Sequence, residues 1–110
     1  MQRLRGILPI LQTPLDQHGR FDAAAMIKQI EFCGTSCVAG VVFPAMASEF
    51  FALSDDERFA MVEVVCDATP VGTPVVAGVA GVSALHAAAF AAHAREHGAS
   101  AVMAMPPYTR

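Results

Sequence analysis

The side chains of this chain that could do chemistry are few, and one group of them stands in the run FPAMASEF at residues 43–50. The run holds one hydroxyl, on Ser48, and one carboxylate, on Glu49, at the point where an apolar segment ends. Glu49 stands between apolar neighbours, and a carboxylate in such a place needs hydrogen-bonding partners. We therefore interpret it as a group that shapes the turn rather than as an acid catalyst.

A second group consists of three histidines on one face of a predicted helix, His86, His93 and His97. His93 and His97 have the i, i+4 spacing that can ligate a metal ion. The residue directly after His93 is not the glutamate of an H-E-x-x-H motif, and the sequence indicates no third ligand. We interpret this face as solvated or as an interface, and we predict no metal site.

A third group is the acidic run SDDE at residues 54–57. Ser54 can cap a helix, and Glu57 at the third helical position completes a capping box. Asp55 and Asp56 would then lie near the positive end of the helix dipole, where negative charge is favourable. Capping explains these acids, so they do not indicate a catalytic pair.

Composition and charge exclude several classes of function. With 55% hydrophobic and 15% charged residues, the chain is globular and of about one domain. A formal net charge of -3 leaves no basic stripe for phosphates, so nucleic acid is not expected as a partner. The opening MQRLRGILPILQTP has an apolar stretch too short for a membrane span or a signal peptide, so we expect a cytoplasmic protein with no membrane partner.

The cysteines Cys33, Cys37 and Cys66 are odd in number and lack C-x-x-C spacing. A disulfide scaffold uses paired cysteines, and a zinc site uses closely spaced pairs. We therefore predict reduced and mostly buried thiols.

Four short apolar runs bounded by glycine or proline are typical of strands, and they lie at residues 6–13, 38–43, 73–77 and 100–105. None alternates apolar with polar residues, which predicts strands covered on both faces, the usual state of a parallel strand.

The segments between these runs have helical character. Asp22 can cap a helix over residues 22–33, with Gly34 as a left-handed stop. A second helix is predicted to follow Ser54, and a third over residues 83–97, ended by Gly98.

Strand and helix alternate about every 30 to 35 residues, the length of a βαβ unit, which predicts a parallel α/β fold over residues 1–110. The open doubly wound sheet and the closed barrel remain the two arrangements to consider. The turn TPLDQHG after the first strand lacks the glycine cradle of a dinucleotide fold. The run GVAG at residues 78–81 lacks the lysine and hydroxyl of a P-loop, but a phosphate-binding α/β protein stays open as an alternative.

Four pieces of the chain together resemble the N-terminal half of the dihydrodipicolinate synthase and N-acetylneuraminate lyase family. They are GILPILQTPLDQHGRFD, CGTSCVAGVVFPAMASEFFALSDDER, TPVVAGVAG and HGASAVMAMPPYTR. The resemblance implies a TIM (β/α)8 barrel, commonly tetrameric and without a cofactor. It also implies a Schiff base between a lysine and a 2-keto acid, usually pyruvate, beside which a carbon–carbon bond forms or breaks.

The resemblance also implies site residues. The family's turn G-T-T-G-E holds the carboxylate of the keto acid, and Glu49 matches its glutamate. This places Met46, Ala47 and Ser48 in the substrate-binding turn without the two threonine hydroxyls. Backbone N–H groups of Ala47 and Ser48 can still hold an oxyanion, whereas Met46 cannot relay a proton. Tyr108 in MPPYTR matches the family's catalytic relay tyrosine, and an unperturbed pKa near 10 suits a phenol to relay rather than to act as a free base.

The lysine of the family lies on its sixth strand, which has no counterpart before Arg110. Lys28 is the only lysine here and belongs to the polar face of a predicted outer helix. Because a complete barrel needs about 250 residues, we predict that residues 1–110 are a partial barrel of about four βα units, incomplete at the C-terminus and inactive alone. A noncatalytic α/β module or assembly piece is the alternative.

Overall fold

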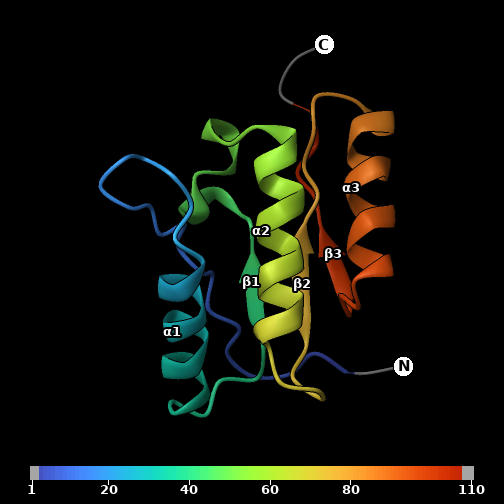
Figure 1. Ribbon diagram of the computed structural model, residues 1–110. Coiled ribbons are helices and arrows are strands. Elements are labelled where there is room, and N and C mark those ends of the chain that lie inside the picture. The colour runs from blue at the N-terminus through green and yellow to red at the C-terminus, as the bar shows by residue number, and fades with distance from the viewer. Residues whose placement is uncertain (1–2, 108–110) are drawn as a thin grey trace.

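The computed structural model of the chain describes residues 3–107, and it has a three-stranded parallel sheet with helices packed on one face (Figure 1). The helices are α1 (Ala23–Gly34), α2 (Asp55–Ala68) and α3 (Ala84–Glu96), and the strands are β1 (Val41–Phe43), β2 (Val75–Gly78) and β3 (Ala101–Met103). Two short 3-10 helices, η1 (Met46–Ser48) and η2 (Phe50–Ala52), lie between β1 and α2. The predicted parallel α/β fold is confirmed.

Consecutive strands lie side by side in the order β1-β2-β3, and both pairs are parallel. Val41 pairs with Val75, and Val76 pairs with Ala101. The connection from β1 to β2 passes through α2, and that from β2 to β3 passes through α3. Since all strands run in one direction, their carboxyl ends share one edge of the sheet, which is the upper edge in Figure 1.

The first predicted strand, residues 6–13, is an extended segment rather than a strand, and this part of the prediction is wrong. It runs parallel to β1 and pairs with it only at Ile10 and Val42. The Leu11 N–H donates to the Val42 carbonyl at 2.9 Å, and the Val42 N–H donates to the Pro9 carbonyl at 2.9 Å. Pro9 has no N–H to continue this ladder toward the amino end, which limits the pairing to a single bridge.

The main core lies between the sheet and the helices. Alternate strand residues point to this side, because successive side chains of a strand point to opposite faces. The strand members of the core are Val41, Phe43, Val75 and Ala77, and the helix members include Met26, Ile30, Met61, Val62, Val65, Phe90 and Ala94. A smaller buried cluster on the other face holds Val42, Ala45 and Val76, against which Leu8 and Ala101 pack.

Capping side chains begin all three helices, as predicted for Asp22 and Ser54. Asp22 accepts a hydrogen bond from the Ala25 N–H at 3.0 Å. The Ser54 hydroxyl accepts from the Glu57 N–H at 3.1 Å, and the Glu57 carboxylate accepts from the Ser54 N–H at 3.0 Å. Hydrogen bonding to the Ser54 backbone N–H, and to a lesser extent to its side chain, holds the pKa of the Glu57 carboxyl below its usual value. Ser83 caps α3 by accepting from the N–H three residues later.

The predicted left-handed stop at Gly34 is wrong, because Gly34 is the last residue of α1 and Thr35 caps the helix with φ -83. The hydroxyls of Thr35 and Ser36 both donate to the Phe32 carbonyl, at 2.7 and 3.2 Å, and so satisfy an end carbonyl without a glycine. At the end of α3, by contrast, Gly98 has φ +94, the left-handed conformation expected there.

The helices of residues 3–107 include none with the length and apolar character that crossing a membrane requires.

Candidate functional site

A cavity of about 190 Å³ lies at the carboxyl ends of the strands. Its lining comes from all four successive parallel segments of the chain, and it consists of Ile10, Pro44, Ala45, Met46, Phe50, Gly78, Ala80, Met103 and Met105. Side chains in this lining are apolar, so polar contacts to a ligand would come mainly from the backbone. Small-molecule sites of parallel α/β proteins lie at this edge.

The turn after β1 supplies the cavity's first wall. Ala45 is extended, η1 follows, and Glu49 has the left-handed angles φ 58 and ψ 43. The Ser48 N–H donates to the Ala45 carbonyl, and the Glu49 N–H donates to the Met46 carbonyl, both at 2.9 Å. The Glu49 side chain is exposed, whereas we expected a carboxylate engaged in shaping the turn. Glu49 therefore contributes its unusual backbone conformation to the turn.

Ser48 joins this turn to the first segment. Its side chain is completely buried, and its hydroxyl accepts from the Ala45 N–H at 3.1 Å and donates to the Leu11 carbonyl. The Ser48 carbonyl in turn accepts from the Thr13 hydroxyl at 2.6 Å. The polar groups of Ser48 thus hold the turn in place. Thr13 takes part in shaping the mouth, which is the region around the carboxyl ends of the strands.

The other predicted site residues differ in their surroundings. Met46 is 57% exposed and lines the cavity. Ala47 is exposed, and its N–H has no hydrogen-bond partner within residues 3–107. Tyr108 lies outside the described residues, so the predicted relay tyrosine stays a prediction. Lys28 is exposed on α1, away from the cavity, as the sequence predicts.

Gly78 allows the end of β2 to lie very close to Pro44, directly after β1. A Cβ added at this glycine would lie 1.5 Å from the Pro44 carbonyl oxygen, so only glycine fits. A Cβ at Gly81 would lie 2.7 Å from the His86 ring nitrogen Nδ1. Close packing therefore explains two glycines of the GVAG run, which we considered as a phosphate cradle.

Arg58 is a buried residue of this region that the sequence analysis missed. Its Nη1 donates to the Ala80 carbonyl at 2.8 Å and its Nη2 to the Gly78 carbonyl at 3.3 Å. The guanidinium carbon lies 3.7 Å from the centre of the Phe90 ring and 5.2 Å from that of Phe50. Arg58 thereby fixes the loop after β2 against α2 and α3.

A sequence signal for Arg58 exists. The residue lies three, four and seven positions before Met61, Val62 and Val65, which are all buried. This spacing places the arginine on the core-facing stripe of α2. An arginine on that stripe indicates a buried guanidinium with partners to find.

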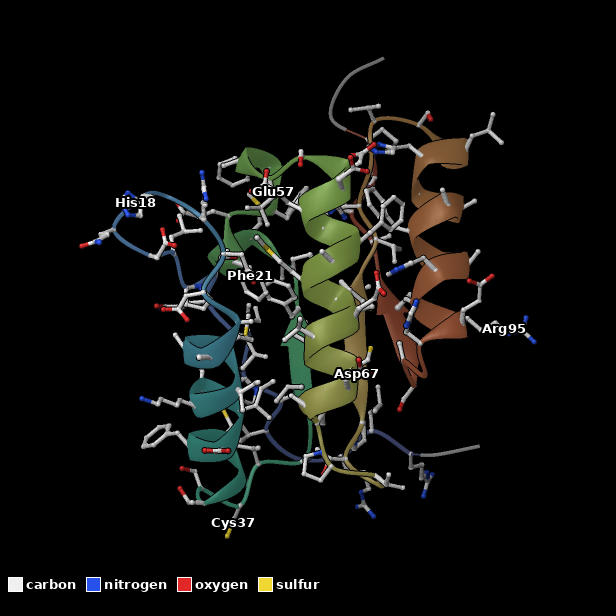
Figure 2. All side chains as sticks on the ribbon, viewed as in Figure 1. His18, Phe21, Cys37, Glu57, Asp67 and Arg95 are labelled. Atoms are coloured by element: carbon white, nitrogen blue, oxygen red, sulfur yellow. The ribbon has the colours of Figure 1, made fainter. Side chains whose placement is uncertain are left out.

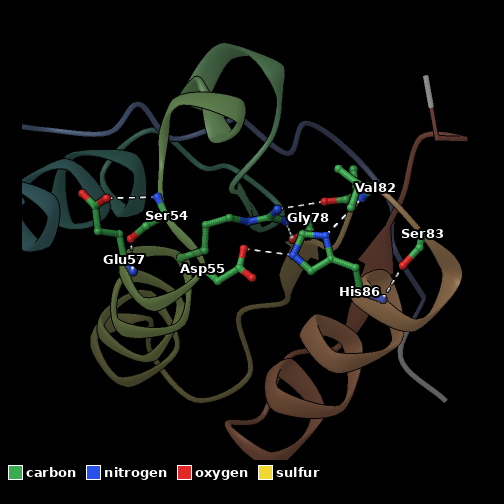
Figure 3. A network of polar contacts seen from close by, with 9 residues as sticks. Ser54, Asp55, Glu57, Gly78, Val82, Ser83 and His86 are labelled. Atoms are coloured by element: carbon green, nitrogen blue, oxygen red, sulfur yellow. Dashed lines mark hydrogen bonds and ion pairs between the residues drawn. The ribbon is translucent and has the colours of Figure 1, made fainter. Parts of the chain in front are cut away.

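His86 takes part in a network of polar contacts with Asp55, Val82 and Ser83 (Figure 3). Its Nδ1 accepts from the Val82 N–H at 3.1 Å, and its Nε2 lies 2.9 Å from the Asp55 carboxylate. Since Nδ1 accepts, the proton of the neutral ring is on Nε2 and is donated to Asp55. Asp55 therefore does more than favour the helix dipole, because it links α2 to α3.

The cysteines are all free. Cys33 and Cys66 are half-buried, but Cys37 is exposed at the lower end of the molecule, so the prediction of mostly buried thiols is wrong for it (Figure 2). Burial raises the pKa of the Cys66 thiol, and the nearby charge of Asp67 raises it further.

Comparison with known proteins agrees with this arrangement. Residues 3–110 match the model of the dihydrodipicolinate synthetase family. The 4-hydroxy-tetrahydrodipicolinate synthase of Methanococcoides burtonii is 34% identical over 103 residues, which cover 94% of this chain and 35% of that protein. The L-2-keto-3-deoxyarabonate dehydratase of Azospirillum brasilense is 33% identical over 106 residues, which cover 96% and 34%.

Solved structures show the same fold. The dihydrodipicolinate synthase of Bacteroides thetaiotaomicron superposes with a TM-score of 0.90 at 30% identity, over 96% of this chain and 35% of that one. A prophage protein of the dihydrodipicolinic acid synthase family from E. coli, in complex with pyruvate, superposes with a TM-score of 0.90 at 27% identity, over 94% and 35%. The chain thus spans about 35% of the length of such relatives. It belongs to the dihydrodipicolinate synthetase family and forms part of that family's barrel.

Proposed function

We propose that this chain is the N-terminal portion of a Schiff-base-forming lyase or synthase of the class I aldolase type, acting on pyruvate or a related 2-keto acid. The observation that carries the proposal is the cavity at the strand ends, whose wall contains Ala45 and Met46, where the turn of residues 46–48 begins. The relatives support the substrate class, since one is named for a 2-keto sugar acid and another is in complex with pyruvate.

In this proposal the carboxylate of the keto acid lies against the turn. The Ala47 N–H is the donor that the turn does not already use, whereas the Ser48 N–H is bonded to the Ala45 carbonyl. Met46 and the other apolar groups of the cavity face the rest of the ligand and exclude water from it. Tyr108 relays protons, because Met46 has no hydroxyl that could do so.

The covalent step needs an amine from outside residues 1–110. A deprotonated lysine adds to the keto carbon, and loss of water gives the iminium that stabilises the neighbouring carbanion. Lys28 is unsuited to this role, because it is exposed on α1 and away from the cavity. Residues 1–110 alone are therefore inactive. In the same proposal, the active protein is a complete cytoplasmic barrel that needs no cofactor and assembles as a homotetramer.

Borohydride reduction in the presence of pyruvate tests the proposal. A protein that continues this chain through a complete barrel is expected to gain the mass of one reduced pyruvate adduct. Residues 1–110 alone are expected to gain none. No adduct on the complete protein would contradict the proposal and favour a noncatalytic assembly piece.

That alternative has one observation in its favour. Both hydroxyls of the family's carboxylate-binding turn are replaced here, by Met46 and Ala47. The trapping experiment separates the two functions, because a noncatalytic module needs no reactive lysine.

A further inference from the structure

We propose that Glu63, His93 and His97 form a binding site for a divalent transition-metal ion, with Zn²⁺ as the representative ion. The three residues offer one carboxylate oxygen and two imidazole nitrogens, and these ligand atoms all lie within 4.8 Å of one another. Glu63 comes from α2 and the histidines from α3 and its end, so a bound ion would join the two helices.

The third ligand of this site could not be found from sequence spacing, because it lies on a different helix. His93 and His97 are one helical turn apart, and their rings lie 4.5 Å apart between centroids. The third ligand is 30 residues earlier, on a different helix: Glu63 Oε2 lies 3.2 Å from His93 Nε2, and Glu63 Oε1 lies 3.7 Å from His97 Nε2. We expected a solvated or interface face, and the structure packs it against α2.

These spacings are close to what a metal ion requires. Zinc binds imidazole nitrogen and carboxylate oxygen at about 2.0–2.2 Å, so tetrahedral ligand atoms lie about 3.4 Å apart. The separation of Glu63 Oε2 from His93 Nε2 is already within about 0.2 Å of that value, and His97 Nε2 lies 3.7 Å from the other oxygen of the same carboxylate. Small rotations of side chains on fixed helices would complete the set, and a fourth position would remain for water.

The surroundings favour a cation. The side chains are partly shielded, at 17% exposure for His93, 31% for His97 and 45% for Glu63, and the Phe59 ring packs on that of His93 at 4.7 Å. His97 is also the C-cap of α3, where the helix dipole attracts positive charge. With neutral imidazoles the three ligands carry one net negative charge.

No neighbouring cation in residues 3–107 other than the two histidines pairs with the Glu63 carboxylate, so it can bind a metal ion. Across residues 3–107, the ion-pair partners of Glu63 are His93 and His97 alone. Arg95 points away from α2 in Figure 2, and Asp67 lies one turn after Glu63 and adds negative charge nearby. The site lies at the end of α3 opposite the strand-end cavity, so the ion would clamp α2 to α3 and would not touch a keto acid bound at the mouth.

Titration of Zn²⁺ into the untagged 110-residue chain, followed by calorimetry, tests the proposal. Cys33, Cys37 and Cys66 are changed to alanine first, because thiolates bind zinc on their own. We expect one ion per chain at micromolar concentration, with a thermal midpoint that rises as Zn²⁺ is added.

Single substitutions of each ligand give the second arm. Glu63→Gln, His93→Gln and His97→Gln should each weaken Zn²⁺ binding by about tenfold or more. Removing a metal ligand lowers the affinity at least as much as removing a residue that hydrogen-bonds to a ligand. The matched controls Glu31→Gln and His18→Gln remove the same groups from exposed positions and should leave the affinity within about twofold. His97→Gln disturbs packing least, and circular dichroism checks its fold.

Absorption of bound Co²⁺ gives an independent readout. The cysteine-free chain with all three ligands intact should show the visible bands of a low-coordinate site, and His97→Gln in the same background should lose them. The proposal is overturned if the cysteine-free chain binds no Zn²⁺. It is also overturned if the folded ligand variants bind as well as the controls.

Discussion

The two ends of the α2–α3 layer carry similar side chains that have different partners. At the mouth end, Arg58 and His86 each bind backbone groups of the loop after β2, and His86 also contacts the Asp55 carboxylate. At the far end, Glu63, His93 and His97 contact one another. Polar groups that satisfy the main chain specify the fold, whereas side chains gathered around each other keep lone pairs for a ligand. The difference teaches that burial of a titratable group is a weaker sign of function than the identity of its partner.

The largest effect should come from Gly78→Ala, which tests whether close packing at the mouth fixes the fold. The new Cβ would lie 1.5 Å from the Pro44 carbonyl oxygen, so the strands must separate. We expect a loss of about 3 kcal/mol or more in the free energy of unfolding, measured by urea denaturation.

Gly34→Ala is the matched control for that substitution. No atom lies within 4 Å of the added Cβ, and Gly34 is helical without a positive φ. This change should stabilise the chain by about 0.5–1 kcal/mol. Equal effects at the two glycines would remove the close-approach explanation.

Arg58→Ala should have the next largest effect. It leaves the Gly78 and Ala80 carbonyls without their guanidinium donors and empties the space over the Phe90 ring. We expect a loss of about 2–3 kcal/mol in the free energy of unfolding. The exposed Arg20→Ala should change it by less than about 0.5 kcal/mol, and a similar loss there would show that net charge is responsible.

Ser48→Ala should cost less, about 2 kcal/mol, because two buried backbone groups lose one hydroxyl partner. Ser36→Ala removes an exposed hydroxyl bond to Phe32 and should cost less than about 0.5 kcal/mol. Thermal unfolding of both variants gives the comparison. If Ser48→Ala were as mild as Ser36→Ala, the turn would not depend on its hydroxyl.

The smallest effect concerns pH and the capping box of α2. The pKa of Glu57 is lowered on folding, so its contribution is fully present above the usual value of 4.5 and is lost as pH falls through the folded value. Glu57→Gln should therefore flatten the decline in stability between neutral pH and the region below pH 4.5, as denaturation midpoints would show. An unchanged decline would assign the acid sensitivity to other carboxylates.

The sequence was most informative where the cause of structure is local. Ser54 and Glu57 cap α2 through neighbours three residues apart, and Gly98 ends α3 in the left-handed conformation. The prediction at Gly34 failed for a local reason as well, since the hydroxyls of Thr35 and Ser36 took the place of a glycine. Local patterns compete with each other, and the sequence does not rank them.

The candidate site was predictable only in part. The order of parallel strands was enough to place Met46 at the cavity, because parallel strands end at one edge, whereas the binding roles of Ala47 and Ser48 stay predictions. The sequence could not show that the Ser48 hydroxyl bonds to Leu11, 37 residues away, or that Glu63 meets His93 across two helices. Such pairs depend on packing between elements, which spacing along the chain does not encode.

The most direct test of the proposed function is a crystal structure, with pyruvate bound, of a protein that continues this chain through a complete barrel. Our account predicts a pyruvate carboxylate oxygen at about 3 Å from the Ala47 nitrogen, with the keto carbon joined to a lysine outside residues 1–110. Pyruvate bound elsewhere, or joined to Lys28, would contradict it.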